Sequence, residues 1–385
     1  MSPISLVAPP RTGLPLHAAP SRALARSRHW LTAVATSLGL LGLAATSGIL
    51  ALANHFIDEL SRPHQELDEA HLPAQIAAGW RMPVGAAEPP ATLQRPLAFR
   101  SASGPLLRGE FWAQPLPAPT MVVCHGYRTS RMRLRPVAAL EYAHGFNVLL
   151  FDFRGHGESA SVPTTGGVAE VHDLEAALGV AAAQPETLPG RIILHGFSMG
   201  ATIALLAPPH PDVAAIIADS PYARLDTVLR HYLQLTLATG SANWHPLLRR
   251  FSHLFPLFAW GAVSVSRLVF RIRFGHPLVG HPEAVFKRTP ARGASAQPLH
   301  RPPILLIHAA GDGFVPVAHA RRIADAARAT RAPLETYFVD CEGHCAAYGH
   351  DPERYVATVM RFLAERVLEP AAAQDVVAKR QQRQR

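Results

Sequence analysis

The feature that most constrains the fold of this 385-residue chain is a repeated alternation between short apolar runs and longer helix-like stretches. Apolar runs of this length are typical of strands buried on both faces of a parallel sheet. The runs occupy residues 121–124, 147–151, 192–194, 213–218, 304–307 and 336–339. Helices are predicted over residues 132–144, 168–183, 199–206, 317–329 and 352–367. The alternation therefore predicts an α/β fold whose mostly parallel central sheet carries helices on both faces.

Two segments depart from this alternation. Residues 97–100 and 106–112 predict a β-hairpin. Residues 222–300 separate two strands by far more than a crossover connection needs, so we predict that they form a cap inserted into the fold. Within the cap, residues 251–270 are apolar and aromatic, which favours a helix that lines an apolar pocket or touches lipid. A second membrane crossing there would split the sheet across the bilayer.

Composition excludes several other classes of protein. Hydrophobic residues make up 48% of the chain and charged residues 17%, so a large core can form and global disorder is excluded. Three cysteines are too few for a disulfide scaffold, and no Cys-x-x-Cys pair indicates a zinc ribbon. The net charge is +9, with basic residues gathered at both ends of the chain, but no nucleic-acid-binding motif accompanies them. We therefore expect solvated tails and membrane-flanking clusters, and no nucleic-acid partner.

An uncharged segment near the amino terminus, residues 31–53, is long enough to cross a membrane as a helix. Arginines precede it, and Asp58 and Glu59 follow it, which places the amino terminus in the cytoplasm by the positive-inside bias. We predict a single-pass signal anchor, with the large domain on the extracytoplasmic side of the membrane; in a bacterium this is the periplasmic side of the inner membrane. A signal peptide cleaved after Ala53 is the alternative, because residues 51–53 read Ala-Leu-Ala.

A glycine-rich turn stands between a predicted strand and a predicted helix. Residues 196–200 read Gly-Phe-Ser-Met-Gly and directly follow the apolar run 192–194. A Gly-x-Ser-x-Gly sequence in this position predicts a nucleophile elbow that raises the hydroxyl of Ser198 above the sheet. Gly196 and Gly200 permit the strained backbone and the close approach of neighbouring chain that such an elbow requires.

A serine hydroxyl is a weak nucleophile and needs a base that is held in place by an acid. The base candidate is His344, which directly follows the last predicted strand, and the acid candidate is Asp312, in a turn after the run 304–307. The order Ser198, Asp312, His344 is the order found in α/β-hydrolases. Asp219, which follows another predicted strand, is the rival acid, although it also suits a turn that opens the next helix.

The negative oxygen that forms when a serine attacks a carbonyl needs hydrogen-bond donors in fixed positions. The sequence His125-Gly126-Tyr127 follows the predicted strand 121–124. We expect the backbone amides of Tyr127 and Met199 to form this oxyanion hole, with His125 and Gly126 as supporting residues. The side chain of Tyr127 either lines an acyl pocket or packs in the core.

These motifs resemble those of the α/β-hydrolase fold superfamily, and most of all those of the bacterial membrane-associated serine hydrolases related to the BEM46-like group. The resemblance covers about residues 95–367. It rests on the elbow, on the sequence Asp-Phe-Arg-Gly-His-Gly-Glu-Ser at 152–159, and on His125-Gly126, Gly311-Asp312 and Gly343-His344. The resemblance implies a structural role for Asp152, Arg154 and His156. It carries over the reaction type better than the substrate, since substrate choice in the family usually resides in the cap.

We expect the following organisation along the chain. It comprises a cytoplasmic basic segment at 1–30, the signal anchor at 31–53, a connector at 54–94, the first part of the hydrolase core at 95–221, the cap at 222–300, the second part of the core at 301–369 and a basic disordered tail at 370–385.

Residues and resemblance together imply a membrane-anchored serine hydrolase, carboxylesterase-like or lipase-like, that cleaves carboxylic esters through an acyl-enzyme. A peptidase or a thioesterase is the alternative among enzymes, and a catalytically silent membrane scaffold is the alternative outside them. We expect no organic cofactor and no metal, because His276 and His281 lie in a predicted loop without nearby cysteine or acidic partners. The expected partners are a small ester with an apolar acyl group and membrane lipid. The pairing of Cys341 with Cys345 stays open.

Overall fold

The structure is a computed structural model, and it divides the chain into two compact units, residues 1–52 and residues 53–385. It describes residues 36–37, 39, 43, 46–51, 53–62, 87–240, 250, 252–278, 281–287 and 301–368. In the first unit, residues 46–51 are helical, and all labelled elements belong to the second unit. The predicted basic segment at 1–30 and tail at 370–385 lie outside the described residues, as do many positions of the predicted anchor.

Eight strands form one sheet within the described residues, in the order β1-β2-β4-β3-β5-β6-β7-β8. They are β1 (Gln94–Arg100), β2 (Leu106–Trp112), β3 (Ala118–Cys124), β4 (Asn147–Phe151), β5 (Thr187–Phe197), β6 (Val213–Asp219), β7 (Ile304–Gly311) and β8 (Leu334–Glu342). β2 runs antiparallel to both of its neighbours, and it forms the predicted hairpin with β1. The other strands pair in parallel, which confirms the mostly parallel sheet.

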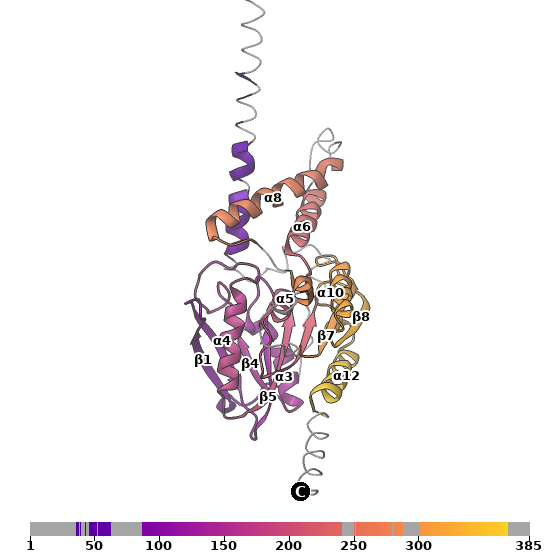
Figure 1. Ribbon diagram of the computed structural model, residues 1–385. Coiled ribbons are helices and arrows are strands. Elements are labelled where there is room, and N and C mark those ends of the chain that lie inside the picture. The colour runs from indigo at the N-terminus through magenta and orange to yellow at the C-terminus, as the bar shows by residue number, and fades with distance from the viewer. Residues whose placement is uncertain are drawn as a thin grey trace, which may run out of the picture. The chain divides into compact units, whose positions relative to one another are not determined.

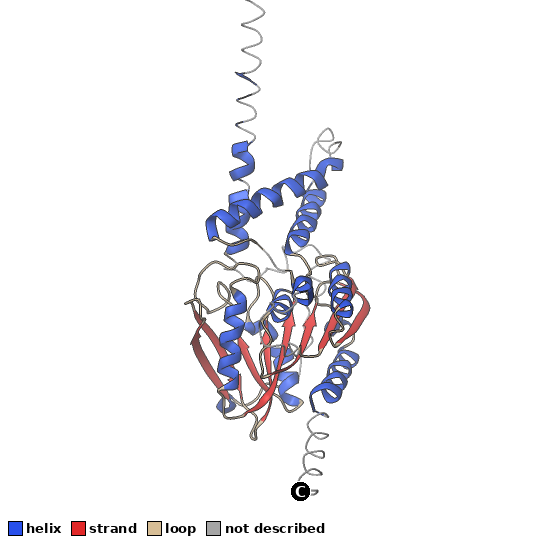
Figure 2. Ribbon diagram, viewed as in Figure 1, coloured by secondary structure: helices blue, strands red, loops and turns tan. Residues whose placement is uncertain are grey.

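Helices cover both faces of this sheet (Figure 2). The helices are α3 (Arg135–Ala143), α4 (Glu170–Ala182), α5 (Met199–Leu206), α6 (Leu225–Gly240), α8 (Phe255–Phe274), α9 (Pro282–Lys287), α10 (Ala318–Ala329), α11 (Ala347–His350) and α12 (Pro352–Leu363). Short turns of other helix types are η3 (Ala91–Leu93), η4 (Arg131–Leu134), η6 (Ser252–Leu254) and η7 (Ala364–Leu368). Buried side chains of α4, α5 and α10 belong to one core cluster, and those of α3 and α12 belong to the other.

The central strands carry continuous apolar runs because they contribute to both of these clusters. In β3, Val122 and Cys124 belong to the cluster with α4, whereas Met121 and Val123 belong to the cluster with α12. Successive side chains of a strand point to opposite faces, so a strand covered on both sides needs apolar residues at every position. The continuous apolar runs of the sequence therefore arise from burial on two faces.

After β6 the chain leaves the sheet, and α6 and α8 lie beyond one end of the strands (Figure 1). Helix α8 buries Ala259, Val263 and Phe270, which recur at helical spacing on one side. Its outer side carries exposed apolar residues, among them Leu257, Trp260, Leu268 and Ile272. By length and composition, Ser252–Phe274 is the one helical stretch of the described residues that is able to cross a membrane, and less than a quarter of it is buried.

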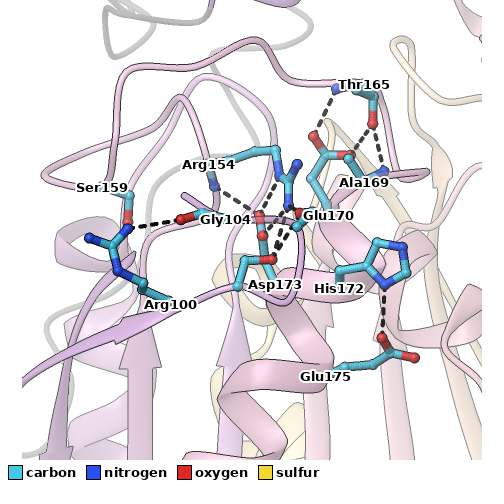
Figure 3. A network of polar contacts seen from close by, with 12 residues as sticks. Arg100, Gly104, Arg154, Ser159, Thr165, Ala169, Glu170, His172, Asp173 and Glu175 are labelled. Carbon is cyan, nitrogen blue, oxygen red and sulfur yellow. Dashed lines mark hydrogen bonds and ion pairs between the residues drawn. The ribbon is translucent and has the colours of Figure 1, made fainter. Parts of the chain in front are cut away.

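The loop after β4 is held by buried charged groups (Figure 3). The backbone amide and Nε of Arg154 donate to Oδ2 of Asp173 on α4, at 3.1 and 2.9 Å. Glu170, at the start of the same helix, accepts hydrogen bonds from the backbone amide and the hydroxyl of Thr165, each at 2.8 Å. Because every partner is buried, these contacts fix the path of the loop, as expected for a structural role of Arg154.

Replacing Asp173 with asparagine should lower the free energy of unfolding by about 3 kcal/mol, because the buried guanidinium of Arg154 would lose its counter-charge. Urea denaturation of the full-length chain measures the change. The matched control is Glu175→Gln on the same helix, since Glu175 pairs at 2.9 Å with the exposed His172 and an exposed pair contributes little. Equal losses of stability in the two variants would contradict a structural ion pair at Arg154.

Candidate active site

Ser198 lies in the predicted turn between β5 and α5, in a conformation that few residues other than glycine adopt. Its φ is 52° and its ψ is −109°, which stores strain in the backbone. The backbone amide of Ser198 donates to the carbonyl of Asp219 at 2.8 Å, and its own carbonyl accepts from Thr202 at 3.0 Å. The end of β6 and the first turn of α5 therefore hold the strained residue in place.

The two glycines of the elbow are required by close packing. A Cβ atom at Gly196 would lie 2.5 Å from the backbone nitrogen of Ala201. A Cβ atom at Gly200 would overlap the carbonyl of Cys124, at the end of β3. Helix α5 thus packs directly on the backbone of the sheet, and larger residues would push the elbow away.

The structure brings together the three residues that the sequence predicted as nucleophile, base and acid. The hydroxyl of Ser198 donates to Nε2 of His344, with 2.7 Å between the two atoms. Nδ1 of His344 donates to Oδ2 of Asp312, also at 2.7 Å. The residues follow β5, β8 and β7 respectively, and all three are buried. Parallel strands end at the same edge of a sheet, which explains why residues 146 positions apart meet there.

The acid and the base stabilise each other's charged forms. Burial opposes ionisation of Asp312, but His344 beside it and the amide of Val315 hold its pKa below the ordinary value. Burial likewise opposes the charged form of His344, yet the carboxylate of Asp312 raises the pKa of His344 well above its ordinary value. An imidazole made more basic in this way is suited to accept the proton of Ser198.

A fourth buried residue, His308, stands beside Asp312 and was missed by the sequence analysis. Its Nε2 donates to the carbonyl of Val315 at 2.7 Å and lies 3.5 Å from Oδ2 of Asp312. Burial lowers the pKa of His308, so the ring stays neutral and keeps its proton on Nε2. His308 lies within β7, where an apolar run hides it, and no local pattern signals its contact with the acid.

The rival acid, Asp219, lies close by but has other partners. Its carboxylate accepts hydrogen bonds from the hydroxyl of Ser220 at 2.8 Å and from that of Tyr355 at 3.1 Å. Burial raises the pKa of Asp219 to about 6, because these two donors and the imidazoles of His195 and His344 do not offset the loss of solvent. The geometry therefore assigns the contact with His344 to Asp312.

The predicted oxyanion turn is braced by His125. Nδ1 of His125 donates to the carbonyl of Gly126 at 2.7 Å, and its Nε2 accepts from the amide of Phe153 at 2.9 Å. Burial lowers the pKa of this histidine to about 4, which keeps Nε2 free to accept. Tyr127 and Met199, the expected oxyanion donors, both border the cavity that reaches Ser198.

That cavity has a volume of about 150 Å³ and a mostly apolar lining. Its lining residues include Phe56, Leu60, Tyr127, Gly166, Ser198, Met199, Tyr222, Leu225, Val228, Leu229, Tyr232, Phe314 and His344. Phe56 and Leu60 lie in the predicted connector, and no sequence pattern assigned them or the residues of α6 to a pocket. The spacing of Phe56, Ile57 and Leu60 is the signal that would have indicated one apolar helix face. Within the described residues, no side chain of α8 lines the cavity.

Histidines and cysteines can serve as metal ligands, and two cysteines can form a disulfide. Among the residues that the structure describes, no group of three or more His, Cys, Asp or Glu side chains is placed to hold a metal ion. Cys124, Cys341 and Cys345 are all free thiols, so Cys341 and Cys345 do not form a disulfide here. Burial raises the pKa of the Cys345 thiol, which keeps it protonated.

Two curated proteins of unassigned function are similar to this chain. The uncharacterized protein YqkD of Bacillus subtilis is 26% identical over 257 residues, which cover 63% of this chain and 70% of that protein. The uncharacterized protein Rv2307c of Mycobacterium tuberculosis is 34% identical over 134 residues, which cover 34% of this chain and 47% of that protein. The second likeness thus spans less than half of the relative.

Solved structures extend the likeness to the fold. An esterase of Pyrococcus furiosus, Pf2001, matches with a TM-score of 0.55 at 24% identity, over 73% of this chain and 97% of that one. The model of the alpha/beta hydrolase family matches residues 121–358, which include the elbow and both of its partners. The resemblance to the superfamily is confirmed, while the narrower BEM46-like group stays a prediction. On this match, the chain belongs to the alpha/beta hydrolase family.

Proposed function

We propose that this protein is a membrane-anchored serine hydrolase that cleaves carboxylic esters through an acyl-enzyme. The observation that carries the proposal is the unbroken chain of contacts from Ser198 through His344 to Asp312, with both distances at 2.7 Å. Such a chain activates a serine in many unrelated folds, and it is recognised by geometry and not by sequence position.

In the proposed reaction, Ser198 attacks the carbonyl carbon of the ester while His344 takes the hydroxyl proton. Asp312 holds the ring and stabilises the imidazolium that forms. The amides of Tyr127 and Met199 stabilise the negative oxygen of the tetrahedral intermediate. His344 then gives its proton to the departing alcohol, which leaves Ser198 acylated. A water molecule, deprotonated by the same histidine, releases the acid and restores the serine.

The cavity supports a small ester with an apolar acyl group as the substrate. Its volume of about 150 Å³ is below the roughly 300 Å³ at which drug-sized ligand pockets begin, so it suits an acyl chain better than a folded peptide segment. Leu225, Val228 and Leu229 of α6 offer it apolar surface. A thioester presents the same acyl carbonyl to Ser198, with sulfur in place of the leaving oxygen, so a panel of esters, thioesters and peptides separates these activities.

Membrane attachment is supported by two features. Residues 31–53 carry no charge over a length that is sufficient to span a bilayer, and arginines precede them. The outer side of α8 exposes Leu257, Leu268 and Ile272, of which Ile272 is 75% exposed. We assign the first feature to a single-pass anchor and the second to contact with lipid, with the hydrolase domain outside the cytoplasm.

Replacing Ser198 with alanine should abolish ester hydrolysis and labelling by a fluorophosphonate, with turnover falling by about 10⁴-fold to 10⁶-fold. Only one oxygen atom is removed, so the melting temperature should change little. Ser264→Ala, which removes a hydroxyl from the cap helix α8, is the matched control and should keep both labelling and turnover. A Ser198→Ala enzyme with more than a few per cent of the original activity would exclude Ser198 as the nucleophile, and an unlabelled native chain would favour a silent scaffold.

The pH dependence should identify the acid. A general base must be neutral, so kcat/KM should rise with pH, and the midpoint should lie above the ordinary histidine value of about 6.5 because Asp312 raises the pKa of His344. Asp312→Asn should move the midpoint to lower pH and reduce turnover by about 10⁴-fold. Asp219→Asn, an equal change at the neighbouring carboxylate, should keep the midpoint and most of the activity. The opposite ranking, measured with a non-ionising ester, would move the acid to Asp219.

The full-length chain should remain with the membrane fraction after washing with salt and with alkaline carbonate, because an apolar helix is held by burial and not by charge. A periplasmic reporter fused after Arg385 should be active, and the same reporter fused after Arg28 should be inactive. Release of a soluble chain that begins at Asn54 would show instead that residues 31–53 are a cleaved signal peptide.

A further inference from the structure

We propose that the helix at residues 53–61 is a wall of the substrate cavity, so that Phe56 and Leu60 select the acyl chain and the hydroxyl of Tyr127 holds this wall in position. The proposal rests on the function proposed above and adds its determinants of specificity. The helix lies outside the α/β core in the sequence, more than 30 residues before β1 begins.

The helix is packed on the core in a defined orientation. Ala53, Ile57 and Ser61 are buried, and they recur every fourth residue along one side. Ile57 belongs to the core cluster that also contains α4 and α5, and Phe56 and Leu60 pack against the same cluster while only partly buried. Those two side chains therefore lie at the edge of the buried side, and both border the cavity that contains Ser198 and His344.

The carboxyl end of the helix is capped by Tyr127, the residue whose amide is the expected oxyanion donor. The tyrosine hydroxyl lies 2.9 Å from the carbonyl oxygen of Glu59 and 3.0 Å from that of Leu60, close enough to donate to either. The last four carbonyls of a helix have no partner within the helix, so an outside donor here satisfies groups that would otherwise lack one. Burial raises the pKa of Tyr127 to about 12, and the hydroxyl therefore keeps its proton for this bond.

Three further contacts attach the helix to separate parts of the fold. Arg128 places its guanidinium 2.8 Å from the carboxylate of Glu59, at the end of the helix where a positive charge is favoured. Arg273 of α8 pairs with Asp58 at 2.6 Å, and the amide of Thr164 donates to the carbonyl of Ser61 at 2.8 Å. The helix is thus joined to the oxyanion turn, to the cap and to the loop after β4.

These contacts make the position of Leu60 depend on the oxyanion turn. The amide of Tyr127 is the proposed oxyanion donor and its hydroxyl contacts the end of the helix, so one residue joins the wall to the oxyanion turn. A helix that served stability alone would not need residues at the cavity. Phe56 and Leu60 instead present apolar surface to the same space as Ser198, where each acyl methylene that is buried gains binding.

The test is the dependence of kcat/KM on acyl length, measured on the full-length chain with p-nitrophenyl esters from two to ten carbons. Leu60→Trp should fill the cavity and shift the preferred acyl chain to a shorter length, lowering the octanoyl-to-acetyl ratio of kcat/KM by about tenfold. Leu60→Ala should enlarge the cavity and shift the preference to longer chains. The matched control is Leu116→Ala, at an exposed leucine between β2 and β3, which should keep the profile of the native chain.

Tyr127→Phe keeps the ring and removes the hydroxyl that caps the helix. We expect KM to rise more for octanoyl than for acetyl esters, because the wall is loosened while the amide of residue 127 is retained. Labelling of Ser198 by a fluorophosphonate confirms that each variant is folded. The proposal that this helix selects the acyl chain would fail if labelled Leu60 variants kept the native dependence of kcat/KM on acyl length. It would also fail if they lost activity equally for every acyl length. A native chain that is not labelled would overturn the proposed function and this inference with it.

Discussion

The close contact between α5 and the strands beneath it is the constraint on which the site depends. Helix α5 can begin at Met199 only because Gly196 and Gly200 leave room for the backbone of neighbouring segments. This close contact requires a strained backbone at Ser198, whose φ is 52°. The strain is tolerated because the elbow is built into the middle of the sheet, where β3, β5 and β6 are buried on both faces.

Two buried carboxylates near this elbow differ in what surrounds them. Asp312 faces an imidazole that can carry a positive charge, and its pKa falls. Asp219 faces two hydroxyls, and burial raises its pKa to about 6. A chargeable partner that is hydrogen-bonded to the carboxylate, as His344 is to Asp312, compensates for lost solvent better than a neutral hydroxyl does. One carboxylate is therefore suited to stabilise an imidazolium, while the other acts as a brace whose backbone carbonyl holds the amide of Ser198.

The walls of the cavity come from segments that flank the core. Helix α6 follows β6, and the helix at residues 53–61 precedes the whole sheet. This second helix directly follows, in the sequence, the apolar segment that we propose as the membrane anchor. Attachment and substrate selection would then be assigned to adjoining stretches of chain, while the reacting groups remain on the rigid ends of the strands.

The sequence by itself indicated the parallel sheet, the elbow at Ser198 and His344 as the candidate base, because each is a local pattern of a few residues next to an apolar run. It left two acids open, since Asp219 and Asp312 both follow strands and only their partners differ. It also left the side chain of Tyr127 unassigned and missed Leu60. The choice of acid, the place of the Tyr127 side chain and the position of Leu60 depend on tertiary contacts. One such contact is the hydrogen bond from the Tyr127 hydroxyl to the Glu59 carbonyl, across 68 positions of the chain. Such a contact depends on how whole segments pack, and no periodicity within either segment encodes it.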